Sequence, residues 1–288
     1  MDRLRFLVET YLDYQKDRIR CENRLRSLPK QFAEERFFRE LADAAADFEK
    51  MIAEEMAREL KGEPLYEQYL RYQKGIGPVL AAQLIAFLAR PRDVVIYGVT
   101  KKLSDGSYER RLRSAKVVLE LPPYAIVKEE QLKAKPKYVR VELPPVMAVA
   151  SNPSKLHMYC GLSPGSRLKR GERVRYNPKV KGLMYRVFRQ LLMAKGEWSK
   201  IYEREREAYE KRCPEPEKGS RKLKVFLTAK NIVMRRFVTN MWLVYRWMNG
   251  LPTTRPYAFE KMGHPEVEFQ KPFIETERGI VYLTEKDF

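Results

Sequence analysis

Residues 74–78 restrict the local fold more than any other stretch of this sequence. Gly75 and Gly77 are separated by one residue, and glycine adopts backbone angles that side chains disfavour. Pro78 suits the first position of a helix, where its missing N–H needs no partner, and the apolar run 79–88 follows. The pattern predicts a helix-hairpin-helix turn, whose free amides and helix dipole favour an anion such as a nucleic-acid phosphate. The alternative is a helix-capping glycine before an ordinary core helix.

The net charge favours the first interpretation. The 288-residue chain has 57 lysines and arginines against 38 aspartates and glutamates, a formal charge of +19. Such an excess is typical of proteins that bind a polyanion or a membrane surface. No apolar run reaches the roughly 20 residues of a membrane helix, and the N-terminus lacks a signal-peptide pattern. We therefore expect a cytoplasmic, nucleoid-associated protein whose partner is nucleic acid.

Cysteine and amide usage add two expectations. Cys21, Cys160 and Cys213 lie far apart, so neither a disulfide framework nor a zinc site is predicted, and a reducing cytoplasm fits. Six asparagines and eight glutamines accompany 33% charged residues, a balance that resembles proteins from very hot environments.

Residues 1–62 are predicted to form a coiled-coil helical hairpin. The first helix has an alternating three-and-four spacing, and a second run on the same rhythm covers 37–60 and ends near Gly62. The pair is either an antiparallel hairpin within one chain or half of an intermolecular bundle, and we expect a homodimer through these helices. The predicted seam of the first helix consists of Leu4, Leu7, Tyr11, Tyr14, Arg18, Cys21, Leu25 and Leu28.

The rest of the chain divides into three parts. Residues 91–150 alternate β-branched and aromatic residues around turn signals, which predicts a strand-rich insert. This insert contains a weak duplication, with residues 117–123 resembling 139–145. It interrupts a helix-hairpin-helix domain made of 63–90 and 151–250, and 251–288 is a proline-rich tail that we expect to be extended. The predicted fold class is mainly α with a small β insert.

A second hairpin and two basic tracts complete the candidate DNA-binding surface. The hairpin follows a helix that ends near Cys160, and the tract after it, 167–189, contains nine cations against Glu172 alone. Charges on a merely solvated face usually alternate in sign. We expect amide and side-chain contacts to phosphates, which position the protein without reading base sequence. The predicted contact residues are Lys74, Gly75, Gly77, Gly161, Gly165, Arg167, Lys169, Arg170, Arg173, Arg175, Lys179, Lys181, Arg221, Lys222 and Lys224.

The order of these motifs resembles the C-terminal half of IS110/IS116-type transposases. The resemblance covers about 65–90 and 150–248, and its most specific element is Tyr159-Cys160-Gly161-Leu162-Ser163-Pro164. In that family a Tyr-x-Gly-Leu-x-Pro motif lies in a helix-hairpin-helix region that engages DNA. A nearby serine is the recombination nucleophile, an N-terminal RuvC-like domain supplies four acidic residues, and a structured RNA guides recognition.

This chain departs from the family pattern at the positions of the family's catalytic residues. The nuclease domain has no counterpart here, and Leu168 and Lys169 stand where the serine pair is expected. The resemblance therefore implies a double-stranded DNA-binding relative without recombinase activity, in a role such as bridging or organising DNA. The alternatives are a recombinase subunit that uses Ser166 and an RNA-binding module.

Other constellations of reactive residues are weak. Asp13 with Asp17, and Asp43 with Asp47, share helix faces at a spacing that suits magnesium, but solvated charge is the stronger interpretation. His157 is either a phosphate contact or a helix histidine with its hydrogen bonds satisfied, and His264 has no Cys or second His at metal-ligand spacing. We expect no catalytic residue, metal or cofactor.

Overall fold

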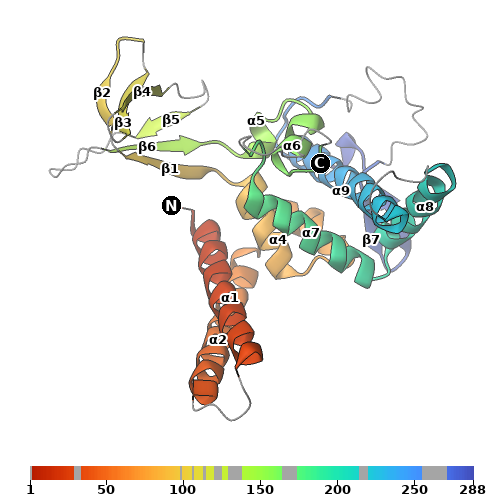
Figure 1. Cartoon of the computed structure of the whole chain (residues 1–288). Helices are drawn as coiled ribbons and strands as arrows, with labels where there is room; N and C mark the ends of the chain where they lie inside the picture. Colours follow the sequence, from red (N-terminus) through yellow and green to blue (C-terminus); the bar gives the residue numbers. More distant parts are fainter. Residues whose placement is uncertain are drawn as a thin grey trace.

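The computed structural model describes residues 2–28, 34–97, 99–105, 107–112, 115–119, 125–128, 138–163, 174–213, 220–254 and 271–288. A helical body carries a two-helix arm and a strand-rich lobe, which project from it in different directions (Figure 1). The chain is thus mainly helical with a small antiparallel β insert, as the sequence predicts. No described helix is long and apolar enough to cross a membrane.

The arm consists of α1 (Arg3–Ser27) and α2 (Glu34–Glu59), which pack along each other (Figure 1). Asp2 caps α1 by accepting a hydrogen bond from the amide of Arg5 at 2.9 Å. Leu4 and Val8 of α1 are buried in the same core as Met56 of α2, where the arm joins the body. Farther out, the Arg18 Nε donates to Glu49 Oε1 at 2.6 Å. The arginine in the predicted seam therefore pairs with the neighbouring helix of the same chain.

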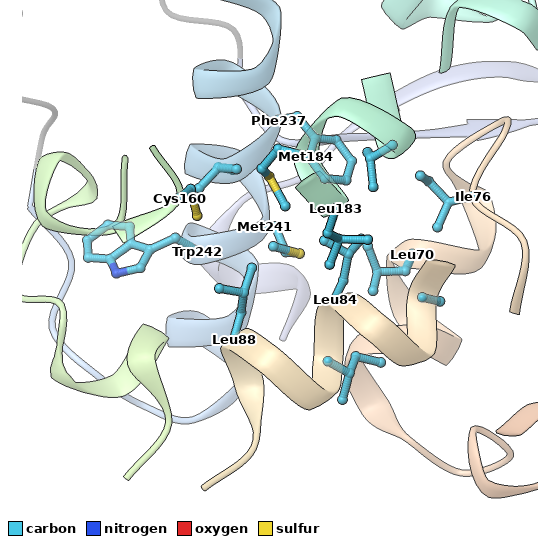
Figure 2. Close-up of a cluster of buried hydrophobic side chains, with 14 of the residues drawn as sticks. Leu70, Ile76, Leu84, Leu88, Cys160, Leu183, Met184, Phe237, Met241 and Trp242 are labelled. Carbon is cyan, nitrogen blue, oxygen red and sulfur yellow. The ribbon is translucent and has the colours of Figure 1, made fainter. Parts of the chain in front are cut away.

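The helical body is built around α9 (Arg221–Met248). The chain enters it through α3 (Pro64–Gln68), the 3-10 turn η1 (Leu70–Tyr72), α4 (Pro78–Leu84) and the π-helix η2 (Ile85–Ala89). After the insert come α5 (Val146–Val149), α6 (Pro153–Tyr159), α7 (Pro178–Met193) and α8 (Glu197–Arg212). Figure 2 shows the buried side chains of α4, η2, α6, α7 and α9 that meet in one core, including Leu84, Leu88, Cys160, Met184 and Trp242.

The insert forms two three-stranded antiparallel sheets. One has the order β1 (Arg92–Tyr97), β6 (Tyr138–Leu143), β5 (Ile126–Lys128). The other has the order β2 (Val99–Lys102), β3 (Tyr108–Leu112), β4 (Ala115–Leu119). Val99, Tyr108, Val139 and Val141 form a small core of their own. The two copies of the duplicated sequence include β4 and β6, which belong to different sheets.

Arg246 of α9 holds the segment in which the chain re-enters the body after the insert. Its guanidinium donates to the carbonyls of Met147, Ala148 and Ala150 at 3.0 to 3.2 Å, which are the carbonyls around the end of α5. The Trp242 Nε1 also donates to Ala150 O at 2.9 Å. These bonds satisfy carbonyls that a short helix leaves free at its C-terminus.

The end of the chain differs from the extended tail that we predicted. Within 271–288, β7 (Phe273–Thr276) and β8 (Gly279–Tyr282) form a hairpin, and the 3-10 turn η5 (Glu285–Asp287) follows. Phe273 is buried in the body beside Trp198. The buried amide of Gln73 holds both, since it accepts from Trp198 Nε1 at 2.8 Å and donates to Phe273 O at 2.7 Å. The hairpin is therefore part of the folded body.

Replacement of Gln73 by leucine should lower the stability of the whole body. The change leaves the Trp198 N–H and the Phe273 carbonyl buried without partners, at a cost of about 1 to 3 kcal/mol for each group. Urea unfolding followed by tryptophan fluorescence measures the loss. Gln190→Leu, at an exposed position on α7, is the matched control and should change stability by less than about 0.5 kcal/mol. Equal effects of the two changes would contradict the role assigned to Gln73.

Candidate nucleic-acid interface

The start of α7 lies against the end of α6. The Asn177 side chain caps α7 by accepting from the amides of Lys179 at 3.0 Å and Val180 at 3.4 Å, and Pro178 occupies the first helical position. The Asn177 backbone N–H donates to Tyr159 O at 2.9 Å, and its side-chain amide donates to the Tyr159 hydroxyl at 2.8 Å. One asparagine therefore begins α7 and fixes it to the chain at the end of α6.

The predicted second hairpin is a tight turn at Gly161. Its φ of +69° lies in the left-handed region that favours glycine. A Cβ at this position would come within 2.9 Å of the Lys181 side chain and 3.2 Å of the Tyr176 ring. The turn therefore needs glycine both for its backbone angle and for the close packing of Lys181.

Two lysines and two tyrosines meet where α7 passes α9, and we call Tyr176, Lys181, Tyr185 and Lys230 the α7–α9 cluster. Lys181 Nζ lies 4.3 Å from the centre of the Tyr176 ring, and Lys230 Nζ lies 5.8 Å from the centre of the Tyr185 ring. Burial lowers the pKa of Lys230, and the positive charge of Lys181 lowers it further. Aromatic faces stabilise both cations, and no carboxylate in the described part of the chain forms an ion pair with either.

Charge is segregated among the helices of the body. Neither α7 nor α9 contains an acidic residue, whereas they carry four and seven cations respectively. In contrast, α8 has five acidic and five basic residues, and its Glu205 pairs with Arg236 at 2.9 Å. Of these three helices, α7 and α9 are the two that are purely basic, and the α7–α9 cluster lies where they meet.

The predicted contact residues divide into three groups. Arg175, Lys179 and Lys181 are exposed at the start of α7, next to or within the cluster. Arg221, Lys222 and Lys224 lie at the start of α9, where Arg221 Nη2 donates to Glu210 O at 2.9 Å. Lys222 precedes Lys230 by eight residues, which is roughly 12 Å along a helix. Outside the described residues lie Gly165, Ser166, Arg167, Lys169, Arg170 and Arg173, in the segment that leaves the Gly161 turn after Ser163 and returns at Val174.

The first predicted turn lies at the other end of α7. A Cβ on Gly75 would come within 2.6 Å of Gln190 O, and Gln190 follows Lys181 by nine residues, roughly 14 Å along the helix. Lys74 lies close to Gly196 and to Glu275, a carboxylate that accepts from the Glu197 amide at 3.2 Å. The two predicted turns therefore lie against opposite ends of α7.

The two glycines of this turn have different roles, contrary to the sequence-based expectation that both are conformationally required. Gly75 has a φ of +98° and touches the backbone of α7, so it needs to be glycine. Gly77 has a φ of −78°, which any residue adopts, and a Cβ there would meet nothing within 4 Å. In addition, the first helix of the motif is divided into α3 and η1.

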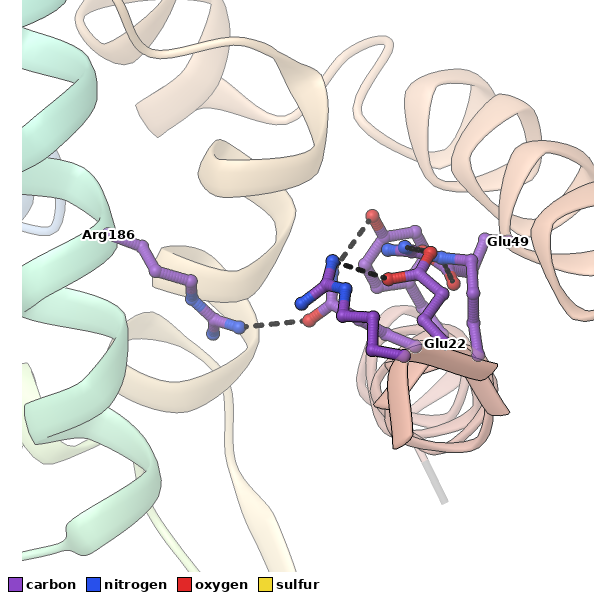
Figure 3. A network of polar contacts seen from close by, with 7 residues as sticks. Glu22, Glu49 and Arg186 are labelled. Atoms are coloured by element: carbon purple, nitrogen blue, oxygen red, sulfur yellow. Dashed lines mark hydrogen bonds and ion pairs between the residues drawn. The ribbon is translucent and has the colours of Figure 1, made fainter. Parts of the chain in front are cut away.

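Arg186, which belongs to the basic tract, has a structural role. Its Nη2 donates to Gln83 Oε1 at 2.7 Å and its Nη1 to Gln15 Oε1 at 3.2 Å, so it joins α7 to α4 and to the arm (Figure 3). Burial lowers its pKa. In the arm, Arg18 donates to Glu22 Oε1 and to Glu49 Oε1, both at 2.6 Å, and these two glutamates are labelled in Figure 3.

His157 is a buried helix histidine, the second of the two interpretations that its sequence position left open. Its Nε2 lies 3.0 Å from Thr239 Oγ1 and 3.1 Å from Arg235 O. Burial lowers its pKa to about 4, and the nearby Arg235 charge contributes. The Nε2 atom therefore already has two partners within the chain, which is typical of a structural histidine.

The paired aspartates of α1 are surface ion pairs. Asp13 accepts from Lys16 at 2.6 Å and Asp17 from Arg20 at 2.9 Å. In the described ranges no group of three His, Cys, Asp or Glu side chains is arranged to hold a metal ion. Cys21, Cys160 and Cys213 are buried and are not joined to one another by a disulfide.

Sequence reasoning missed Tyr176, Tyr185 and Lys230 as site residues. Tyr185 follows Lys181 by four residues, a spacing that places both on one helix face, so this pair was visible in the sequence. Lys230 was not, because only packing of α9 against α7 brings it there. Comparison with protein families, curated proteins and solved structures finds no match for this chain. The relation to IS110-type transposases therefore stays a prediction from the motif.

Replacement of Gly75 by alanine should destabilise the protein, whereas the same change at Gly77 should not. The new methyl group at Gly75 meets the α7 backbone in a strained left-handed conformation, for which about 1 to 3 kcal/mol is expected. At Gly77 the methyl group projects into open space, and the change should remain within about 0.5 kcal/mol. Thermal unfolding of both variants measures the difference. Similar melting temperatures would contradict this account of the turn.

His157 should make stability fall as the solution is acidified. The unfolded histidine takes up a proton below pH 6.5, its ordinary pKa, whereas the folded one stays neutral down to about pH 4. Protonation therefore favours the unfolded state in this window, by up to about 1.4 kcal/mol per pH unit. Urea unfolding between pH 7 and pH 4.5 should show a shallower loss for His157→Gln than for the wild type. Parallel pH profiles would show that His157 is not held neutral.

Proposed function

We propose that the protein binds double-stranded DNA through its phosphate backbone, with the α7–α9 cluster at the centre of the contact. The observation that carries this proposal is that Lys181 and Lys230 lie over the rings of Tyr176 and Tyr185, 4.3 Å and 5.8 Å from the ring centres, while no carboxylate in the described residues forms an ion pair with either lysine. A like-charged pair is unfavourable unless an anion compensates it. A phosphate of a polyanion supplies that compensation and releases counterions into solution.

The surroundings of the cluster support a polymer rather than a single small anion. Cations continue on one side to Arg175 and Lys179 and along the solvent-facing side of α7 to Arg189. In sequence, the segment 164–173 has four arginines and lysines against one glutamate. The start of α9 adds three more basic residues, Arg221, Lys222 and Lys224. Such a continuous cationic surface suits a backbone that repeats its charges.

The tyrosines give the cluster a second kind of contact. Tyr185 is 47% exposed at the surface of α7, beside Lys230. A phenol ring next to an ammonium group packs against a sugar while the cation contacts the neighbouring phosphate. These contacts position DNA without selecting its sequence, so binding should be general.

The relation to IS110-type transposases is part of the same proposal. It is supported by the motif from Tyr159 to Pro164, whose Gly161 turn packs directly against Lys181. The proposed role is that of a non-catalytic, nucleoid-associated relative, and we assign Ser166 no covalent function. Lys74 and the open side of Gly77 remain a separate proposed contact at the start of α4.

Removal of the two cluster charges should reduce the salt dependence of DNA binding. If the wild type neutralises some six phosphates, the log–log slope against salt has a magnitude of about 5. The double variant Lys181→Gln and Lys230→Gln should reduce that magnitude by about 2, with a similar loss on every duplex sequence. Fluorescence anisotropy with short duplexes at several salt concentrations measures this. Lys200→Gln on α8, where Lys200 pairs with Glu197, is the matched control.

An unchanged slope in the double variant, or an equal change in Lys200→Gln, would place the binding surface elsewhere. The same titrations distinguish the two alternative functions. Structured RNA that displaces duplex DNA completely at equal concentration would favour an RNA-binding module. Magnesium-dependent strand cleavage that Ser166→Ala abolishes would replace the non-catalytic proposal with a recombinase.

A further inference from the structure

The outward side of α2 carries a regular row of exposed apolar residues. Phe37, Leu41, Phe48 and Met51 are 57%, 43%, 45% and 60% exposed, and Ala44 lies exposed between them. We call these five residues the α2 outer stripe. Their positions follow a four, three, four, three spacing, which places them along one face of the helix and is typical of a seam that contacts another helix. Single exposed apolar residues are ordinary, whereas a contiguous row marks an interaction site.

Most of this stripe lies outside the surface that α1 covers, and only Phe48 also stacks on Tyr14 of α1, with ring centres 4.8 Å apart. The side of α2 that is buried within the chain is formed by Ala42, Ala45, Glu49 and Met56. Since successive residues turn by about 100° in a helix, the centre of the stripe lies roughly 100° around α2 from the centre of that buried side. In a four-helix bundle each helix has two neighbours at about a right angle. The direction of the stripe is therefore that of a second neighbouring helix.

The α1 seam that the sequence suggested for self-association is already occupied. Of the seam residues, Leu4 and Cys21 are buried, Tyr14 stacks on Phe48 of α2, and Arg18 is held by Glu49 of the same chain. A partner that uses this seam would have to displace α2. A partner at the α2 outer stripe leaves the hairpin intact.

Charge identifies the occupant. Helix α2 has nine acidic and four basic residues, a net charge of −5, so a nucleic acid would be repelled from it. On the side of the stripe that is remote from α1, Asp47 and Glu54 are exposed, and Glu40 forms an ion pair with Arg36 of the same helix. Helix α1 has seven basic and four acidic residues, a net charge of +3. Its exposed Arg20 and Arg26 form ion pairs with Asp17 and Glu22 of α1 itself. The arm thus combines an apolar stripe, an acidic rim and a basic neighbouring helix.

We propose that the α2 outer stripe packs against the arm of a second copy of this chain. Two arms related by a two-fold axis form a four-helix bundle, in which the basic α1 of each copy lies near the acidic rim of the other. An isologous contact of this kind needs complementary features on one surface, and the arm supplies them. The arrangement is independent of the proposed DNA contact, because the arm and the α7–α9 cluster share no residue.

Substitution of two stripe residues by glutamate tests the proposal. At tens of micromolar, the wild type should have twice the chain mass of 34.1 kDa in multi-angle light scattering, and Leu41→Glu with Met51→Glu should have the mass of one chain. Both positions are exposed, so the circular dichroism spectrum of the variant should match that of the wild type. Met193→Glu, at an exposed apolar position on α7, is the matched control and should keep the double mass.

A wild type with the mass of a single chain, or a stripe variant that keeps the double mass while folded, would overturn the proposal. Loss of the double mass in Met193→Glu as well would show that the change in mass is not specific to the stripe, and would also overturn the proposal. Duplex binding by the stripe variant reports separately on the proposed function. If the stripe variant has the mass of one chain and still binds one duplex, the dimer contact and the DNA contact are independent of each other.

Discussion

The burial of one face of α9 is the constraint on which the rest of the body depends. This 28-residue helix places Phe237, Val238, Met241 and Trp242 in the core, where each large apolar side chain contributes about 1.5 to 3 kcal/mol. The helices α3, α5, α6, α7 and α8 all contact it. Since its polar residues include no carboxylate, every charge that remains on its outer side is positive. The same packing that forms the core therefore also fixes a cationic surface.

The packing of α7 on α9 gives that surface its particular form. Asn177 starts α7 against the end of α6, and the missing side chain at Gly161 makes room for Lys181. Lys181 and Lys230 consequently approach each other from different helices. Tyrosine faces partly compensate their charges, while burial and mutual repulsion disfavour the charged state of Lys230. An anion at this position offsets both unfavourable effects on the charged state of Lys230, namely its burial and its repulsion by Lys181. This compensation is the physical basis of the proposed function.

The sequence was informative where a local pattern determines the structure. Helical periodicity, the strand-rich insert and the cap at Asn177 all follow from short-range rules, and the left-handed turns at Gly75 and Gly161 lie at predicted glycines. The sequence was less informative where the role of a residue depends on which distant parts of the chain pack together. The requirement for glycine at position 75 but not at 77 arises from contact with Gln190 of α7, more than 100 residues later in the chain.

The same limit applies to the arm, the tail and the site. Two apolar rows on α2 differ by only one position, so periodicity alone could not decide which row faces α1 and which faces solvent. The tail was predicted to be extended, because a local pattern cannot show that Phe273 packs against Trp198, a residue 75 positions earlier in the chain. Lys179 and Lys181 could be selected from a basic run, whereas Lys230 required knowledge of how α9 crosses α7.

The central claim is that duplex DNA contacts the α7–α9 cluster, and site-specific photocrosslinking tests it most directly. A photoreactive phenylalanine derivative in place of Tyr185 should form a covalent adduct with duplex DNA under ultraviolet light. The same group in place of Tyr282, an exposed tyrosine on β8, should form none. Adducts at Tyr282 but not at Tyr185, or equal adducts at both, would contradict the assignment of the interface to the face that α7 and α9 share.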